Sequence, residues 1–530
     1  MAESGNQRVS ARATGVVGIA ILCSRILGLV REMVIAAMFG ASAYLDAFLT
    51  AFRAPNMLRD LFAEGALSTA FVTTFSKKIA SEGDRSAWTL ANKIATLTTI
   101  FMSIVVVLGV LLAPVLVAAL APGFSAEKAA LTVTLARVMY PFILLVSLAA
   151  LVMGMLNAKH VFGVPAMASS FFNLGSIVGG VALAWWLDPG FGPRALVGLA
   201  LGTLIGGLLQ LAVQIPSLMK VGYVFHPDFH WRDEGVKKVL QLMGPAVIAA
   251  SAVQVNVLIN SIFASYLQDG AVSWLNIAFR LMQLPLGIFG VAVATVTLPL
   301  ISRSAAQGNT AEFRGALSHA LRLVMLLTIP SAIGLIIMAE PIISLIYQHG
   351  RFTAAATEQT AGALRFYAIG LVGYSAVKVL APAFYALDRR NLPMIVSLVS
   401  IALNAALNGL LTFRLGLGHR GLALSTSVIA ATNFLALYVM MRHYAGRLET
   451  GALLRTLAKL AAAGAMLGVV CWLGTQFFFP AGQSFRFGWK LLGVSVTMAA
   501  GAAVFFCAAY LLRVAELHDI VVVAQRKLRR

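Results

Sequence analysis

The chain has 530 residues, of which 60% are hydrophobic and only 11% are charged, and its formal net charge is +20. A mean hydropathy of +0.88 excludes a water-soluble globular protein. Apolar runs of about 20 residues recur along the whole chain, and each is long enough to cross a bilayer core as a helix. The sequence therefore predicts an all-α, polytopic membrane protein with no sizeable soluble domain.

The N-terminal apolar stretch is expected to remain as the first membrane helix. Arg25 and Arg31 interrupt it, and no clear small-residue cleavage site follows, so a cleaved signal peptide is not indicated. Cys23, Cys471 and Cys507 lie far apart in apolar segments, which predicts neither a disulfide framework nor a metal site. The sequence also lacks the nucleotide-loop and metalloprotease motifs. We therefore expect no cofactor and no enzyme activity.

Apolar length predicts about 14 membrane helices in chain order. Lysine and arginine gather in alternate connections, so the positive-inside rule places both termini in the cytoplasm and requires an even number of spans. Basic loops of this kind explain the net charge without nucleic acid as a partner. The approximate spans are 12–39, 44–76, 88–120, 130–157, 163–187, 195–219, 238–266, 272–301, 315–339, 358–387, 393–413, 420–441, 453–478 and 490–513.

A faint internal repeat divides the chain. The segment "YPFILLVSLAALVMGMLNAKHVFGVP" (140–165) resembles "YAIGLVGYSAVKVLAPAFYALDRRNLP" (367–393), and "GALSTAFVTTFSK" (65–77) overlays "VAVATVTLPLISR" (291–303) at nearly the same separation. The repeat predicts two pseudo-symmetric lobes of six helices in the same orientation, as in several transporter folds. The predicted divisions are 1–225 for the first lobe, 226–447 for the second, and 448–530 for two additional C-terminal helices with a basic cytoplasmic tail.

Several predicted spans contain charged residues, which are costly in a bilayer and therefore line a wet cavity or pair with one another. Arg25 and Glu32 are seven residues apart in span 1, as are Asp46, Arg53 and Asp60 in span 2, and this spacing places each set on one helical face. The other candidates in or near the spans are Arg31, Arg59, Glu64, Arg280 and Lys378.

These charges have two interpretations. The functional one is a cavity that binds an anion, because arginine makes bidentate contacts with phosphate and stays charged. The structural one is a set of ion pairs that stabilise the helices. Asn404 and Asn408 in span 11, with Asn256 and Asn260 in span 7, are more simply read as interhelical hydrogen-bonding groups. His226 and His230 in the basic loop are not expected to bind a metal.

Longer motifs resemble the MurJ (MviN) family of bacterial lipid II flippases, within the superfamily of multidrug, oligosaccharidyl-lipid and polysaccharide exporters. The resemblance covers nearly the whole chain, and "PNMLRDLFAEGA" is its most specific piece. The matching segments are "SRILGLVRE" (24–32), "DAFLTAFRAPNMLRDLFAEGALSTAFVTTF" (46–75), "APGF" (121–124), "GPAVIAASAVQVNVLINSIFASYL" (244–267), "RLMQLPLGIFGVAVATVTLP" (280–299), "YQHGRFT" (347–353) and "VKVLAP" (377–382).

The resemblance implies a flippase that moves lipid II, the undecaprenyl-diphosphate-linked precursor of peptidoglycan, from the cytoplasmic to the periplasmic leaflet by alternating access. It implies a bacterial inner-membrane protein whose spans 13 and 14 form a groove for the polyprenyl tail. Anionic membrane lipids and other cell-wall synthesis proteins are expected partners. The implied substrate-binding residues are Arg25, Arg31, Arg59 and Arg280, supported by the cavity charges Glu32, Asp46, Arg53, Asp60, Glu64 and Lys378.

The chain departs from the family at span 8. Members often carry Asp before the span 8 arginine, where this chain has Phe279, and an acid one turn later, where it has Gln283. Spans 7, 11 and 12 contain no carboxylate, so no sodium site is predicted and the energy source stays open. The alternatives are an exporter of another polyprenyl-diphosphate oligosaccharide, a cation-coupled drug exporter, an intramembrane enzyme on polyprenyl lipids, and a non-transporting scaffold for cell-wall synthesis.

Overall fold

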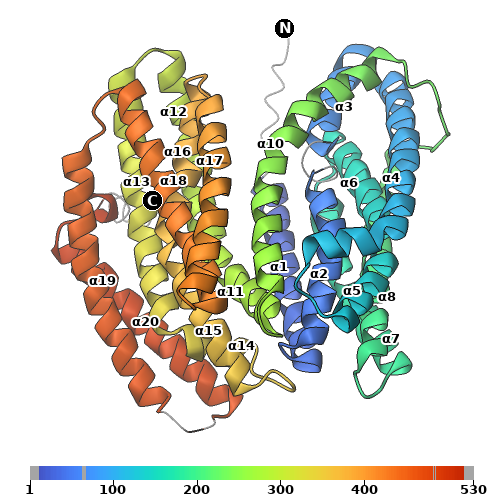
Figure 1. Cartoon of the computed structure of the whole chain (residues 1–530). Coiled ribbons are helices and arrows are strands. Elements are labelled where there is room, and N and C mark those ends of the chain that lie inside the picture. Colours follow the sequence, from blue (N-terminus) through green and yellow to red (C-terminus); the bar gives the residue numbers. More distant parts are fainter. Residues whose placement is uncertain (1–10, 62–66, 481–482, 484, 519–530) are drawn as a thin grey trace. The chain divides into compact units, whose positions relative to one another are not determined.

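The computed structural model describes residues 11–61, 67–480, 483 and 485–518. Within these residues the chain is helical and contains no strand (Figure 1). It divides into two compact units, Met1–Asp269 and Gly270–Arg530, which are described separately. The all-helical fold predicted from hydropathy is therefore confirmed.

The first unit contains ten helices among its described residues. Pro55 lies near the end of α2, and a π-helical turn follows at residues 59–61. The helices are α1 (Ala11–Phe39), α2 (Ala43–Leu58), α3 (Ser68–Glu82), α4 (Asp84–Leu120), α5 (Ala126–Met139), α6 (Phe142–Ala158), α7 (Gly163–Leu187), α8 (Pro193–Ala212), α9 (Ile215–Lys220) and α10 (Glu234–Ser265).

The second unit contains ten α-helices and two π-helical segments among its described residues. These segments are η2 (Leu286–Gly290) and η3 (Gly409–Arg414). The α-helices are α11 (Ala271–Pro285), α12 (Val291–Ala306), α13 (Thr310–Ile337), α14 (Ala339–Ile346), α15 (Ala354–Ile369), α16 (Leu371–Ala386), α17 (Asn391–Asn408), α18 (Gly418–Ala445), α19 (Thr450–Phe478) and α20 (Phe487–Leu511).

Ten helical segments among the described residues are long and apolar enough to span a membrane, and the pair α15 and α16, bent by 42°, makes an eleventh. The three other predicted spans, 12–39, 44–76 and 238–266, correspond to α1, to α2 with α3, and to α10. The described parts of these segments are helical too, but they lie outside that set. A multi-pass membrane fold is confirmed, and the count of 14 spans stays a prediction.

The division into lobes at residue 225 also stays a prediction. It rests on the sequence repeat, whereas the compact units reflect packing within the structure. Their boundary follows α10, because α10 packs against α3 and α4 of the first unit.

Helices α7 and α8 pack closely because glycines line their interface. A Cβ atom on Gly202 would lie 2.3 Å from the Cα of Gly180, and one on Gly198 would lie 2.4 Å from the backbone nitrogen of Ala184. Small residues at helical spacing let backbones approach, which is a common source of helix association in membranes. The α7–α8 pair therefore has no room for larger side chains at these positions.

Polar side chains join α17 to α18. The Ser425 hydroxyl donates to Oδ1 of Asn408, and the Ser400 hydroxyl donates to Oδ1 of Asn433. The interhelical hydrogen bonding predicted for the asparagines of span 11 is thus confirmed for Asn408.

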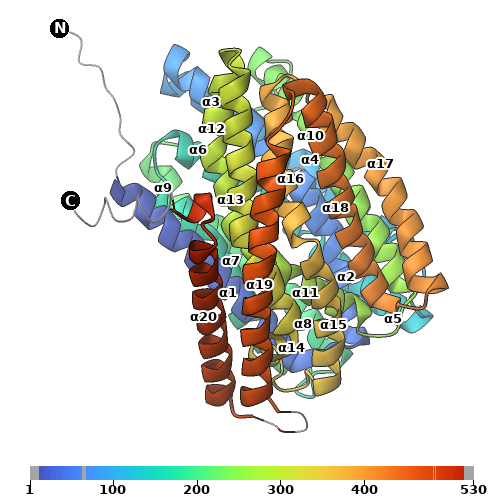
Figure 2. The ribbon, with the colours of Figure 1, turned by 90° about the vertical axis from the view of Figure 1, so that its left-hand side faces the viewer.

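The C-terminal helices α19 and α20 lie side by side and pack against α13 (Figure 2). At one end, Arg322 of α13 donates to Oε2 of Glu449 at 2.8 Å and also binds the buried carboxylate of Glu516. The hydrogen bond from Arg322 lowers the pKa of Glu449 below its usual value. At the other end, Nζ of Lys490 on α20 lies 3.3 Å from Oε1 of Gln348. The α19–α20 pair is thus attached at both ends to the rest of the second unit.

We expect Gly202→Val to destabilise the protein by about 1–3 kcal/mol, because the added side chain must separate two backbones. Thermal unfolding of the detergent-solubilised protein measures the effect. Gly334→Val in α13 is the matched control, since a Cβ at Gly334 meets nothing within 4 Å. Equal unfolding temperatures for the two variants would contradict this account of the α7–α8 interface.

Candidate functional site

The charged segment of α1, residues 24–32, contacts α7. The side-chain amide of Asn173 donates to the backbone oxygen of Ser24 at 3.2 Å, and the Arg31 guanidinium lies 5.1 Å from the centre of the Phe172 ring. A cation over an aromatic face is attracted by the ring's negative charge density. Arg31 and Glu32 are half-buried, whereas Arg25 is exposed. The α1 charges therefore differ in how much of each is available to a ligand.

The second half of α2 makes polar contacts with α10. Arg53 donates to the hydroxyl of Ser261. Nη2 of Arg59 lies 3.0 Å from Oδ1 of Asp60, and the other carboxylate oxygen of Asp60 accepts from Gln254 at 3.5 Å. Arg53 and Asp60, which share a face by their spacing, therefore both meet α10. Glu64 lies outside the described residues.

Asp46 belongs to a buried ion cluster at the start of α2. Nζ of Lys128, in the first turn of α5, lies 2.9 Å from Oδ2 of Asp46 and 2.8 Å from Oδ1 of Asp269. The Lys128 ammonium also sits 4.2 Å from the centre of the Phe124 ring. The side chains of Lys128 and Asp46 are 7% and 1% exposed, whereas that of Asp269 is 65% exposed. Lys128 and Asp46 thus form a buried pair, and Asp269 is a solvent-accessible partner.

The "APGF" turn holds this cluster against the end of α10. The Gly123 N–H donates to the Ser265 hydroxyl at 3.0 Å, and a Cβ on Gly123 would lie 2.7 Å from the Ser265 backbone. The Ser125 hydroxyl then caps α5 by accepting from the Lys128 N–H at 3.3 Å. Glycine is required in the turn because the two backbones are in contact.

Lys128 is a residue that the sequence-based site omitted. A signal for it is present in the sequence, because Lys128 is one of the few cations on the side of the chain predicted to be non-cytoplasmic. Asp46 and Lys128 each lie in the first turn of a helix that enters the membrane from that side. The sequence thus limits the possible counterions of Asp46 to a few residues, but it does not identify Lys128 among them.

We expect Lys128→Met to cost about 3–5 kcal/mol of stability, since it leaves the Asp46 carboxylate buried without a counterion. Asp269→Asn should cost at most about 1 kcal/mol, because its ion pair is exposed to solvent. Chemical or thermal unfolding of purified protein measures both. Similar losses in the two variants would refute the distinction between a buried and a solvent-accessible partner.

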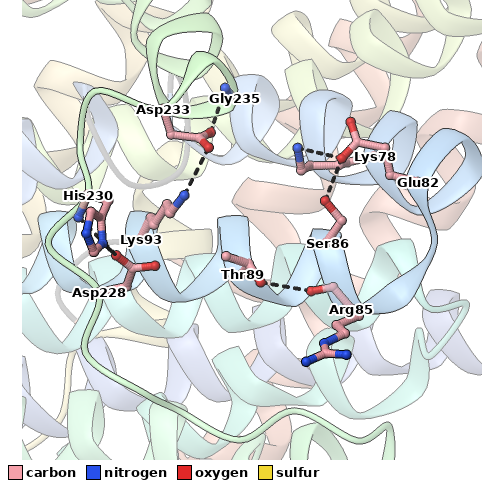
Figure 3. Close-up of polar contacts among 10 residues, drawn as sticks. All are labelled: Lys78, Glu82, Arg85, Ser86, Thr89, Lys93, Asp228, His230, Asp233 and Gly235. Carbon is pink, nitrogen blue, oxygen red and sulfur yellow. Dashed lines mark hydrogen bonds and ion pairs between the residues drawn. The ribbon is translucent and has the colours of Figure 1, made fainter.

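A second polar network surrounds the start of α10 (Figure 3). Nζ of Lys93 on α4 lies 2.9 Å from Oδ2 of Asp233, whose other oxygen caps α10 by accepting from the Gly235 N–H at 2.8 Å. Burial acts to raise the pKa of Asp233, but the hydrogen bonds from Lys93 and Gly235 outweigh it and hold the pKa below its usual value. This network fixes the first turn of α10 to α4.

The segment 221–233 crosses α4 as a strap. The His226 and Asp228 N–H groups donate to the Asn92 side chain and the Thr96 hydroxyl, at 3.3 and 3.1 Å. Oδ1 of Asp228 accepts from the backbone and ring nitrogens of His230, and the backbone bond lowers the pKa of Asp228. Within the described part of the chain, no group of three or more His, Cys, Asp or Glu residues is arranged to hold a metal.

The pKa of Asp233 sets an acid-sensitive contribution to stability. A carboxylate with a lowered pKa stabilises the folded state above its unfolded pKa of about 4, and this stabilisation is lost as the pH falls through the folded value. We expect wild type to lose more stability than Asp233→Asn between pH 6 and pH 3, as measured by unfolding temperature. Asn retains the helix cap, so parallel pH profiles would disprove the role of the charge.

In the second unit, Arg280 on α11 and Lys378 on α16 are both exposed, as is Gln283. Phe279 packs against Tyr367 of α15 with ring centroids 5.3 Å apart. The residue preceding Arg280 therefore anchors α11 by aromatic packing. Arg280 belongs to the second unit, whereas Arg25, Arg31 and Arg59 belong to the first, so a clamp that joins them stays a prediction.

The chain is similar to proteins of one family over most of its length. A family model described as "Lipid II flippase MurJ" matches residues 35–493. The chain is 36% identical to a lipid II flippase MurJ of Burkholderia cenocepacia, over 86% of this chain and 88% of that protein. It is 35% identical to a probable lipid II flippase MurJ of Vibrio cholerae, over 85% of this chain and 86% of that protein.

Solved structures agree with this similarity. A structure titled "Lipid II flippase MurJ, inward closed conformation" matches with a TM-score of 0.75 and 25% identity, over 95% of this chain and 99% of that one. An inward-facing multidrug resistance transporter of the MATE family matches with a TM-score of 0.66 and 15% identity, over 81% of this chain and 96% of that one. At that identity, the second match shows a shared fold alone.

Proposed function

The chain belongs to the lipid II flippase MurJ family, and from this premise we propose that it moves lipid II from the cytoplasmic to the periplasmic leaflet. The observation that carries the proposal is the family match over residues 35–493. The protein would act as a transporter by alternating access, and it would catalyse no chemical conversion.

The diphosphate of lipid II would be recognised by arginine. Planar guanidinium groups donate two parallel hydrogen bonds to phosphate oxygens and keep their charge at any physiological pH. Arg25 and Arg280 are exposed on their helices, and this exposure supports a role for them in meeting an incoming head group. Lys378, also exposed, would add a point charge.

Arg59 and Arg31 would contribute differently. Arg59 is held by the neighbouring carboxylate of Asp60, whose side chain is 35% exposed, so a phosphate would compete with Asp60 for the guanidinium. Arg31 is half-buried beside Phe172. We therefore assign Arg25 and Arg280 to initial capture, and Arg59 and Arg31 to a later, tighter state. Glu32, Arg53 and Asp60 would balance charge, whereas Asp46 would act through Lys128.

The polyprenyl tail would stay in the lipid beside α19 and α20 while the head group crosses. The protein would reside in the bacterial inner membrane with both termini in the cytoplasm, as the distribution of basic loops predicts. Anionic lipids around these basic loops and other proteins of cell-wall synthesis would be its partners.

A rescue assay tests the proposal. In bacteria depleted of their native lipid II flippase, the wild-type chain should restore access of lipid II to the periplasmic leaflet. Arg25→Ala and Arg280→Ala should each reduce it at least about tenfold, the effect of losing one charge-assisted contact. Arg303→Ala, at the exposed end of α12, is the matched control. Membrane levels of each variant are measured in parallel.

Other outcomes point to the rival functions. Failure of a well-expressed wild-type chain would favour an exporter of another polyprenyl-diphosphate oligosaccharide. Growth restored without any lipid II movement would favour a scaffold. Full activity of both arginine variants would show that these arginines are structural.

A further inference from the structure

An apolar pocket of about 180 Å³ lies in the first unit between α4 and α10. Ile94, Leu97 and Phe101 line it from α4, and Val239, Leu240 and Met243 line it from α10. Among the described residues of its lining, Thr98 is the single polar one. The pocket is separate from the arginines discussed above.

Water is a poor occupant of this pocket, because cavities without polar partners stay dry and bind apolar guests. An empty pocket would also forfeit the dispersion contacts that its walls could make. Phe101 and Leu240 are 43% and 48% exposed, so the pocket opens to the outside of the unit. Helix α4 is long and apolar enough to cross a bilayer, with a mean hydropathy of 3.0 over its most apolar 18 residues. The open side of the pocket is therefore expected to meet lipid.

Figure 3 shows the polar network at the start of α10, and the first pocket residue of α4, Ile94, directly follows this network in the sequence. Ile94 follows Lys93, whose ion pair with Asp233 fixes α10 to α4, and Asp228 of the strap is bonded to Thr96. Lys237 and Lys238 directly precede the pocket residues Val239 and Leu240, and both are exposed. A hydrocarbon chain in the pocket would therefore have its head group level with these two lysines.

The acidic residues nearby do not cancel this charge. Asp233 is paired with Lys93, and Asp228 is bonded to His230. Glu234 is exposed in the same helical turn, and it is offset by Arg232, which is exposed as well. The two lysines thus leave the mouth of the pocket positive.

We propose that the pocket binds one acyl chain of an anionic phospholipid, with the phosphate against Lys237 and Lys238. From Ile94 to Met102 the pocket follows α4 for about 12 Å at 1.5 Å per residue. That length suits part of a single acyl chain rather than a long polyprenyl chain. The lipid would fill the space between α4 and α10, and its binding does not depend on whether the protein transports lipid II.

Lipid binding to delipidated, detergent-solubilised protein tests the proposal by native mass spectrometry. The probes are phosphatidylglycerol and phosphatidylcholine with identical acyl chains. We expect phosphatidylglycerol to bind more tightly, and Lys237→Ala with Lys238→Ala to weaken it about 30-fold, the factor that two basic residues supply near an anionic head group. Met243→Trp, which fills the pocket, should weaken both lipids roughly tenfold.

Leu111→Trp is the matched control, since Leu111 is 67% exposed on α4 and lies outside the pocket. Leu97→Phe serves as a second filling variant if Met243→Trp does not fold. Equal lipid binding by the pocket-filling variants and by the Leu111→Trp control would contradict binding in the pocket. Equal affinity for phosphatidylglycerol and phosphatidylcholine would contradict the preference for an anionic head group. Undecaprenyl phosphate that displaces phosphatidylglycerol at equal concentration would identify a polyprenyl chain as the occupant and overturn the assignment.

Discussion

A charge within a hydrocarbon medium must be paired or hydrated, and this constraint organises the whole molecule. In the first unit it is met by several contacts of different kinds. Lys128 neutralises Asp46 inside the protein, Arg59 is held by Asp60, and Arg31 rests on an aromatic ring. These contacts let apolar helices carry ionised groups at all, and they also help to fix how α1 packs against α7 and how α2 packs against α5.

The same constraint separates two roles that look alike in the sequence. Lys128 and Asp46 are almost completely buried, so their charges are committed to each other and to the fold. Arg25, Arg280 and Lys378 are exposed on helices of an otherwise apolar protein. A transporter of an anionic lipid needs both kinds of charge, because the fold must stay intact while the binding groups exchange one partner for another.

Much of the fold could be predicted because hydropathy is a local property. The apolar runs predicted the helices and their order, and the position of Asn408 within one of them indicated an interhelical hydrogen bond but not its partner, Ser425 of α18. The pairing of charges is not local. Lys128 meets Asp46 from a distant part of the chain, and nothing in either segment specifies the other. The family motif likewise indicated that Phe279 replaces an acid, but its packing on Tyr367 depends on how α11 meets α15. Substrate contacts stay a prediction, since the proposed clamp takes its arginines from both units.

The attachment of α19 and α20 at both ends has a mechanical consequence. A helical hairpin attached at one end could rotate about that end. Here one end is held by the contacts of Arg322 with Glu449 and Glu516, and the other end by the contact of Lys490 with Gln348. The two contacts hold the hairpin to α13 and to the residue that follows Tyr347 after α14, so the rest of the second unit restrains it at both ends. Under the proposed function, a polyprenyl tail that lies against the hairpin would meet a surface that keeps its shape while the second unit moves.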